Sequence, residues 1–424
     1  MVVIPEAAQR LSGIAANAGA RRLPYGKALF KLAVLDCSSA SGTEALALLA
    51  KIEPAVLAPS EARVPVARPR LPATGALVPY LRRIDEARWY SNFGPLVTEL
   101  EHRLAARLGE GVMVATAANA TLALALALKA MELPAGGLVA VPSWTFVATA
   151  HAVIQAGLVP WFLDVDADSW MLDPATVQAA LAGAPGKVVA AIPVCPFGAM
   201  PDLAGWRAFR EATGVQVLVD AAAAFDGLGA ADPPVCVSLH ATKVLGVGEG
   251  GFFATTDPEL LERFRRLTSF GFWGSRDSPF PSSNAKLSEY AAAVGLAALD
   301  EWPSERLRYL RLSQHLRIAL LPRPQVRFQP GWGRDWVTSV CVVSLPEGSA
   351  DAVEAALDAA GIETRRWWGK GCHRSPAFAA CPHEALPVTD RLAASVIGLP
   401  FAVDLPADDI ARLAEALGMA LGSQ

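Results

Sequence analysis

Short apolar runs alternate with helical patterns from residue 112 to residue 269, and this alternation limits the possible folds more than any other feature. The runs predicted as strands are 112–116, 138–142, 160–165, 187–193, 215–220, 235–240 and 251–255. The helical patterns between and after them cover 121–131, 148–155, 174–181, 203–213 and 257–269. Such alternation is typical of an α/β fold whose mostly parallel, seven-stranded sheet is covered by helices on both faces.

The pattern changes after residue 285. A long helix is predicted over 286–300, and after the Trp-Pro pair at 302–303 a second, Arg-rich helix runs to about residue 320. A strand at 337–345 and helices at 350–360, 389–396 and 407–421 follow. We therefore predict an N-terminal extension of unassigned role (1–61), a large domain (62–320) and a smaller C-terminal α/β domain (321–424).

Charge and composition argue against several classes of function. The net charge of −4 and the lack of a Lys/Arg-rich block give no reason to expect a nucleic-acid partner. The most apolar run, 115–130, contains Asn119 and Lys129 and is too short to cross a bilayer. Glu6 and Arg10 stand where a signal peptide would have its apolar core, so a cytoplasmic protein is expected. The 6 cysteines lack metal-like spacing, which favours reduced thiols and no metal site.

Lys243 is the first candidate for chemistry. It lies in SLHATKVLGVGEGG and is the only fully charged residue between Pro233 and Glu249. A lysine shielded from water loses its proton more readily and becomes a nucleophile toward carbonyls. The alternative is a surface lysine whose stem covers apolar neighbours. The glycines do not indicate a dinucleotide site, because FFATT follows them as a strand rather than a helix.

Asp220 ends the buried-type strand VQVLVD. Ligands of open α/β sheets bind at the carboxyl ends of the strands. Since Asp220, Ser238 and Lys243 follow successive strands, all three can face one crevice. A lysine that forms a Schiff base and an aspartate that faces a pyridinium nitrogen are the minimum equipment for pyridoxal phosphate. A helix cap is the alternative role for Asp220.

A phosphate site and a cover for a flat ring are also predicted. Asn119, Ala120 and Thr121 open a helix directly after a strand, and small residues there let backbone N–H groups approach an anion. An ordinary N-cap by Asn119 is the alternative. The segment SWTFVAT offers Trp144 and Phe146 as cover, although either aromatic could instead belong to the core.

From about residue 64 to residue 417 the sequence resembles the DegT-type sugar aminotransferases, which have the type I pyridoxal phosphate fold. The matching stretches are RWYSNFGPLVTELE, NATLAL, VPSWTFVAT, DAAAAFDG, SLHATK with GEGG, NAKLSEYAAAVGLAALD and LPVTD…LPF. The resemblance implies a three-layer large domain with a smaller C-terminal domain and pyridoxal 5′-phosphate as cofactor. It also implies a nucleotide-linked sugar as substrate and an amino acid, with L-glutamate expected, as donor.

The resemblance assigns a role to each candidate around the cofactor ring. Lys243 would form the Schiff base and then move the proton between the substrate Cα and the cofactor. Asp220 would keep the pyridine nitrogen protonated. Phe146 would stack on the ring, which leaves Trp144 either structural or facing the substrate.

The phosphate contacts that the resemblance implies come from two chains. Ser238 and the Ala120–Thr121 turn would bind the phosphate of their own subunit. Asn284, which opens NAKLSE, would reach the phosphate of the neighbouring subunit. A homodimer with shared active sites is therefore expected.

Two regions of the sequence bear on specificity. Where the family usually has Gln or His three residues after the aspartate, this chain has Ala223. Arg365, Trp368 and His373 lie where the family's small domain approaches the substrate. Arginine there could bind a diphosphate and tryptophan could stack on a base; a charged surface loop beside a core aromatic is the alternative.

Two other functions are compatible with the same fold. In the sugar dehydratases of this fold histidine replaces the Schiff-base lysine, so Lys243 argues against a dehydratase. A non-catalytic regulator or assembly partner is the other, suggested by Ala223 and the N-terminal extension. The expected function is therefore aminotransfer in amino-sugar biosynthesis.

Overall fold

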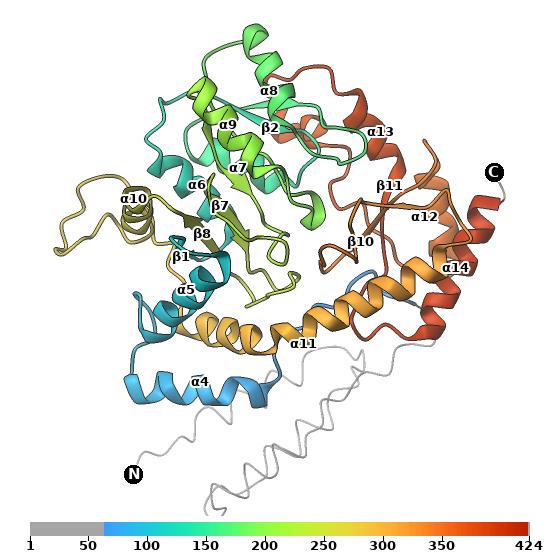
Figure 1. Ribbon diagram of the computed structural model, residues 1–424, viewed down its shortest axis with the longest axis horizontal. Helices are drawn as coiled ribbons and strands as arrows, with labels where there is room; N and C mark the ends of the chain where they lie inside the picture. Colours follow the sequence, from blue (N-terminus) through green and yellow to red (C-terminus); the bar gives the residue numbers. More distant parts are fainter. Residues whose placement is uncertain (1–62, 423–424) are drawn as a thin grey trace, which may run out of the picture. The chain divides into compact units, whose positions relative to one another are not determined.

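The computed structural model of the chain describes residues 63–422. The predicted N-terminal extension lies outside these described residues. Within them, a central sheet is covered by helices on both faces, and a second, smaller sheet lies beside it (Figure 1).

The central sheet contains all seven predicted strands. They are β1 (Met113–Ala117), β2 (Leu138–Pro142), β3 (Val159–Leu163), β4 (Val188–Ala191), β5 (Gln216–Val217) with β6 (Val219–Asp220), β7 (Val235–Ser238) and β8 (Gly251–Thr255). β5 and β6 form one run, because Leu218 between them donates its N–H to the Ala191 carbonyl at 3.1 Å. Asp220 also pairs with Val194 beyond the end of β4. This contact joins two four-stranded sheets in the order β1-β8-β7-β6/β5-β4-β2-β3.

Strand direction and burial confirm the predicted fold class. β8 is antiparallel to both β1 and β7, whereas the other paired strands are parallel. Alternate residues of one strand enter different cores: Val139 and Val141 of β2 belong to one apolar cluster and Ala140 to the other. One cluster includes α6 (Ala120–Ala130), α7 (Val147–Gln155) and α10 (Pro258–Thr268). The other includes α5 (Pro95–Leu108), α8 (Pro174–Ala180), α9 (Leu203–Thr213) and α11 (Glu289–Leu320). The sheet is therefore the middle of three layers.

The smaller sheet follows α11 in the chain. Its antiparallel strands have the order β11-β10-β9, with β9 at Arg327–Phe328, β10 at Cys341–Ser344 and β11 at Val396–Leu399. The remaining elements are α4 (Thr74–Ala87), α12 (Ala350–Ala359), α13 (Pro387–Ser395), α14 (Ala407–Gly422) and short 3-10 turns at Leu181–Gly183, Pro196–Gly198, Cys372–Arg374 and Pro376–Phe378. The predicted domain boundary near residue 320 coincides with the end of α11, and the division into two domains remains a prediction.

The predicted break at Trp302-Pro303 is wrong. α11 is one helix of 32 residues with Pro303 inside it. Proline removes one backbone donor and strains the preceding turn, so tertiary contacts must compensate for that cost. Trp302 is buried and its ring centroid lies 5.2 Å from that of Phe225. Packing of this tryptophan therefore keeps the helix continuous where local propensity favours a stop.

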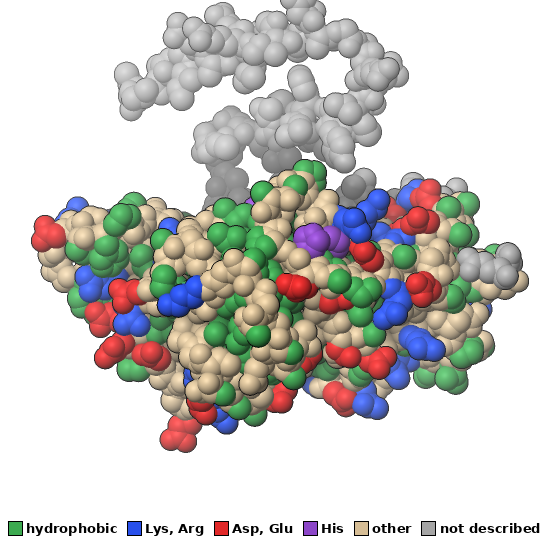
Figure 2. Space-filling view, turned by 90° about the horizontal axis from the view of Figure 1, so that it is seen from above, with side chains coloured by type: hydrophobic (Ala, Val, Ile, Leu, Met, Phe, Trp, Pro, Cys, Tyr) green, Lys and Arg blue, Asp and Glu red, His purple; other side chains and the backbone are tan. Residues whose placement is uncertain are grey.

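The surface shows no strong separation of charge on the face drawn in Figure 2. Basic and acidic side chains are interspersed there around a central apolar zone. This distribution matches the small net charge of −4. Among the residues that the structure describes, no helix has the length and apolar character to span a membrane.

A carboxylate from α11 caps the start of α5. Gly94 precedes that helix and has no side chain to cap it. Instead, the buried Glu289 accepts hydrogen bonds from the N–H groups of Leu96 at 2.8 Å and Val97 at 3.0 Å. A Cβ on residue 94 would lie only 2.7 Å from the Glu289 carboxyl carbon, so glycine is required for this approach. Two helices far apart in sequence are thereby fixed to each other.

We predict that Glu289→Ala destabilises the apoprotein by about 1–3 kcal/mol, because it leaves two buried N–H groups without an acceptor. Chemical denaturation of the variant measures the loss. Glu211→Ala, which removes an exposed glutamate from α9, is the matched control and should change stability little. Equal stability of Glu289→Ala and the wild type would show that water replaces the carboxylate.

Candidate active site

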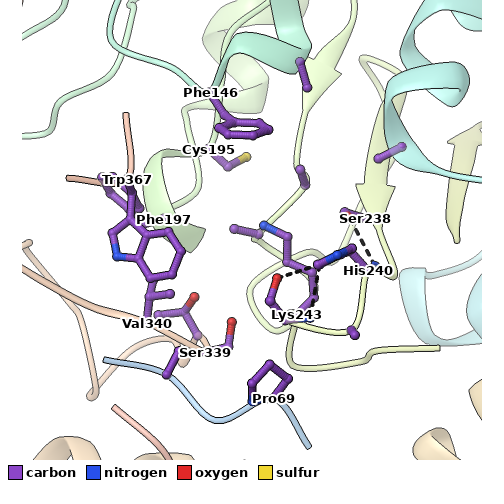
Figure 3. A pocket seen from close by; sticks show the side chains of 18 of the residues that line it. Pro69, Phe146, Cys195, Phe197, Ser238, His240, Lys243, Ser339, Val340 and Trp367 are labelled. Carbon is purple, nitrogen blue, oxygen red and sulfur yellow. Dashed lines mark hydrogen bonds between the residues drawn. The ribbon is translucent and has the colours of Figure 1, made fainter. Parts of the chain in front are cut away.

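The predicted catalytic residues line one cavity of about 440 Å³. β6 ends at Asp220 and β7 ends at Ser238, and the loop from β7 to β8 carries Lys243. Figure 3 shows Lys243 and Ser238 on one side of this cavity and Phe146 above it. The predicted site residues that line it are Ala120, Thr121, Phe146, Asp220, Ser238, Lys243, Arg365 and Trp368.

The Asp220 carboxylate is buried and held by two donors. Its Oδ2 accepts the Thr149 hydroxyl at 2.8 Å, and its Oδ1 accepts the Ala222 N–H at 3.1 Å. Burial raises the pKa of Asp220, while these hydrogen bonds and the charge of Lys243 oppose that rise. A carboxylate fixed at the wall of a cavity is suited to pair with a cationic ring nitrogen.

Two threonines behind Asp220 were not predicted from the sequence. Thr145 and Thr149 are buried, and their hydroxyl oxygens lie 2.9 Å apart. Since Thr149 donates to Asp220, Thr145 is left to donate to Thr149. The signal in the sequence was the pair of threonines in WTFVAT, of which Thr145 lies just before the N-cap Phe146 and Thr149 lies in the first turn of α7.

Lys243 is partly buried in the loop between β7 and β8. Its backbone N–H donates to the His240 carbonyl at 2.8 Å. Burial lowers the pKa of the Lys243 amine, and the nearby Asp220 charge partly opposes this. The amine is therefore closer to its nucleophilic, neutral form than an exposed lysine.

Three of the glycines that follow Lys243 are each required for a different structural reason. Gly248 has a φ of +98°, a backbone conformation that disfavours side chains. A Cβ on Gly250 would lie 2.6 Å from a methyl of Val247. A Cβ on Gly251 would lie 2.6 Å from the backbone nitrogen of Ala120. Gly251 thus keeps the start of α6 open and close to the lysine loop.

The start of α6 is a suitable anion site. The Asn119 side chain accepts the Leu122 N–H at 2.9 Å, so Asn119 is the N-cap of this helix. In the first helical turn, Ala120 and Thr121 have no preceding helical carbonyl for their N–H groups. Both line the cavity beside Ser238. An anion bound there gains from these N–H groups and from the helix dipole.

The aromatic candidates fall into two groups. Phe146 precedes α7, lines the cavity and is 56% exposed. Trp144 is 3% exposed and contacts the edge of Trp368, with ring centroids 5.5 Å apart. Trp144 is absent from the cavity wall, so burial favours the structural role for it.

On the opposite wall, Trp368 stacks on Phe197 with centroids 4.0 Å apart. Arg365 lines the cavity and places its guanidinium over Trp367 at 4.9 Å. Phe197, a contributor missed by sequence reasoning, has a φ of +54°. This aromatic wall, with one arginine beside it, is suited to a planar ligand that carries negative charge.

Besides Trp144, two more predicted residues lie outside the cavity wall. His373 contacts Ser143 instead, with 2.7 Å between its Nδ1 and the hydroxyl oxygen. Asn284 is exposed and accepts a hydrogen bond from Lys286 at 2.5 Å. Ala223 does line the cavity and leaves open the space that a Gln or His side chain would take. The described residues contain no cluster of three or more metal-type ligands.

The donors and acceptors of the cavity fit pyridoxal phosphate. Lys243 supplies an amine, Asp220 a buried carboxylate, the start of α6 an anion site, and Phe146 an aromatic face. The fold and this set of groups define the class of pyridoxal phosphate enzymes with the type I fold.

The chain belongs to the DegT/DnrJ/EryC1/StrS aminotransferase family, which matches residues 74–418. The predictions of an aminotransferase and of pyridoxal phosphate as its cofactor are therefore confirmed. Rv3402c of Mycobacterium tuberculosis H37Rv is 31% identical over 84% of this chain and 89% of its own length.

Two further similarities concern nucleotide sugars. A UDP-N-acetyl-3-dehydro-α-D-glucosamine 3-aminotransferase of Acidithiobacillus ferrooxidans is 32% identical over 70% of this chain and 81% of its own length. The structure of DesI with its TDP-sugar product superposes with a TM-score of 0.75 at 35% identity. That match covers 84% of this chain and 92% of DesI. The function class is therefore amino-sugar transamination.

We predict that Asp220→Asn still binds the cofactor but lowers amino transfer by orders of magnitude. An amide does not stabilise a protonated ring nitrogen as a carboxylate does. Single-turnover kinetics measure the loss, with Asp202→Asn, an exposed helix cap on α9, as control. A loss below about tenfold, ~1.4 kcal/mol of barrier, would identify Asp220 as a structural cap.

Proposed function

We propose that the protein transfers an amino group from L-glutamate to a keto carbon of a nucleotide-linked sugar. The observation that carries this proposal is the convergence of Lys243, Asp220 and the start of α6 on one cavity. Family membership gives aminotransfer, and the two relatives named above that handle nucleotide sugars support the substrate class. The donor is inferred from the family resemblance in the sequence.

Each residue at the cavity has a distinct task in this proposal. Bound pyridoxal phosphate supplies an electron sink for the bond broken at the donor Cα. Lys243 holds the cofactor through its Nζ and then carries the proton from that carbon. Asp220 keeps the ring nitrogen protonated. Ser238 and the Ala120–Thr121 turn hold the phosphate.

The sugar nucleotide is proposed to lie against the opposite wall. Arg365 has its guanidinium over an aromatic ring, which leaves its N–H donors available for a diphosphate. Trp368, stacked on Phe197, gives a flat apolar surface for a base or sugar ring. A dehydratase is disfavoured because Lys243 occupies the position where those enzymes have histidine.

We also propose a homodimer with shared active sites, in the cytoplasm. Phe270 and Trp273 are 42% and 58% exposed in the loop that leads to Asn284. Asn284 itself pairs with Ser269 at the base of this loop. A two-fold dimer would bury these aromatics and bring Asn284 to the partner's phosphate.

We predict that Lys243→Ala abolishes amino transfer and retains no covalently bound cofactor, because no second amine replaces Nζ. The wild-type protein should be yellow when purified and should bleach on borohydride reduction, with the added mass located on Lys243. Lys187→Ala, an exposed lysine, is the control. Undiminished turnover by Lys243→Ala would contradict the proposal. The substrate class is tested separately, by mass spectrometry of nucleotide sugars aminated by the wild-type protein.

A second prediction concerns the shared sites. Asn284→Ala should weaken cofactor retention without unfolding the chain. Mixed with Lys243→Ala, it should recover roughly a quarter of wild-type activity, since half of the dimers would be mixed and each would contain one intact site. No recovery despite demonstrated subunit exchange would show that each site is built by one chain.

A further inference from the structure

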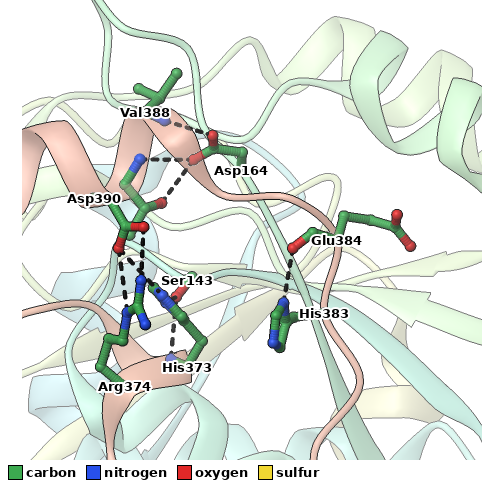
Figure 4. A network of polar contacts seen from close by, with 9 residues as sticks. Ser143, Asp164, His373, Arg374, His383, Glu384, Val388 and Asp390 are labelled. Carbon is green, nitrogen blue, oxygen red and sulfur yellow. Dashed lines mark hydrogen bonds and ion pairs between the residues drawn. The ribbon is translucent and has the colours of Figure 1, made fainter.

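His373 is linked to the loop that follows β2. Ser143 begins this loop, and its hydroxyl oxygen lies 2.7 Å from Nδ1 of His373. The same oxygen accepts the backbone N–H of His373 at 3.2 Å. On the other side of the ring, Nε2 lies 3.4 Å from a carboxylate oxygen of Asp390 on α13 (Figure 4). Both Ser143 and the His373 side chain are buried.

The backbone around His373 holds the same loop. Cys372 donates its N–H to the Ser143 carbonyl at 2.8 Å. Gly371 has a φ of +87°, and a Cβ there would lie 2.7 Å from a Thr389 methyl. Only glycine fits this approach without strain. The 371–373 segment is therefore fixed against the loop by several independent contacts.

The other end of this loop serves the cofactor site. Two residues after Ser143, Thr145 contacts Thr149, which donates to Asp220. The next residue, Phe146, lines the cavity. Any displacement of Ser143 is therefore transmitted over two to three residues to the donor of Asp220 and to the aromatic cover.

The His373 segment also reaches the substrate side of the cavity. Arg365, Trp367 and Trp368 line the cavity a few residues before His373. Trp368 in turn packs against Trp144, which lies between Ser143 and Thr145. One continuous segment thus contacts both the proposed substrate wall and the loop beside the cofactor.

The charged groups around His373 determine its proton state. Asp390, Arg374 and His383 all face the ring. Burial lowers the pKa of His373, while Asp390 raises it and Arg374 and His383 lower it. The neutral ring is therefore favoured at neutral pH. The Asp390 carboxylate oxygen beside Nε2 can only accept a hydrogen, so the neutral ring carries its hydrogen on Nε2. Nδ1 is then an acceptor, and the Ser143 hydroxyl donates to it.

We propose that neutral His373 is a positioning residue for the transamination reaction. It accepts the Ser143 hydroxyl hydrogen and so holds the 143–146 loop in the position that keeps Thr149 on Asp220 and Phe146 over the cofactor. A proton added at Nδ1 would face the Ser143 hydroxyl and break this arrangement. This inference rests on the role proposed above for Asp220.

Three variants test this role. His373→Leu removes the acceptor, whereas His373→Asn places an amide oxygen near the position of Nδ1 and so keeps it. His315→Asn is the control, because that exposed histidine lies on α11 and is not among the groups that shift the pKa of His373. The readouts are kcat and KM, pyridoxal phosphate affinity of the apoprotein, and the visible spectrum of the bound cofactor against pH.

His373→Leu should lower kcat about tenfold or more, which corresponds to ~1.4 kcal/mol of barrier. It should also weaken the binding of pyridoxal phosphate. The KM of the sugar nucleotide should change less than kcat. His373→Asn should retain kcat within about threefold of the wild type. Because burial lowers the pKa of His373 from its ordinary value of 6.5, the ring gains its proton only below that pH. In the wild type, kcat should therefore fall and the cofactor spectrum should change at pH below 6.5. His373→Asn should lack this step, and His315→Asn should behave as the wild type.

A double variant tests whether the effect of His373 is exerted through Ser143. Ser143→Ala combined with His373→Leu should cost less than the sum of the two single losses, because both changes break the side-chain contact between residues 143 and 373. Ser143→Ala also removes the acceptor of the residue 373 backbone N–H, so the double variant is compared with both single variants. Additive losses, or a lowered apoprotein stability with unchanged kcat and cofactor spectrum, would overturn the proposal. These outcomes are separate from failure of the proposed function, which would appear as wild-type protein that binds cofactor but aminates no nucleotide sugar.

Discussion

The burial of the Asp220 carboxylate is the constraint on which the site depends. Asp220 ends the middle strand of the sheet, where chain direction and hydrogen bonding fix its backbone on both sides. A charge in this position is costly unless it is paired, and the protein supplies Thr149, the Ala222 N–H and the amine of Lys243. The same burial that raises the pKa of the carboxylate lowers that of the amine. Burial is the largest cause of both shifts.

Carboxylates that reach across the fold connect its parts. Glu289 of α11 caps α5, and Asp164, directly after β3, accepts the N–H groups of Val388 and Thr389 at 2.7 and 2.8 Å. The second contact fixes the start of α13 against the central sheet. α13 carries Asp390, so the position of that carboxylate beside His373 depends on a strand of the central sheet. The C-terminal residues are therefore positioned by charge-assisted hydrogen bonds as well as by apolar packing.

The aromatic wall shows how one segment can serve two purposes. Trp368 stacks on Phe197 at the cavity and makes a T-shaped contact with the buried Trp144. The prediction that Arg365 and Trp368 approach the substrate stays a proposal, but both line the cavity that contains Lys243. His373, predicted beside them, points away into the Ser143 contact. Residues close in sequence thus have side chains in different surroundings: Arg365 and Trp368 line the cavity, whereas His373 contacts Ser143.

The sequence alone determined the alternation of strands and helices. It also indicated that Lys243, Asp220 and the start of α6 would meet, and all three line one cavity. These are local patterns, and residues that follow parallel strands come together because the carboxyl ends of those strands lie at one edge of the sheet. The tertiary structure decided the features that depend on contacts between residues far apart in the sequence. Burial of Trp302 kept α11 continuous through Pro303. Thr149 of α7 donates to Asp220, and Thr145 contacts Thr149, because α7 packs on the sheet. The place of His373 depended on Ser143, 230 residues earlier in the chain. Contacts over such separations depend on the packing of whole layers, which no short stretch of sequence specifies.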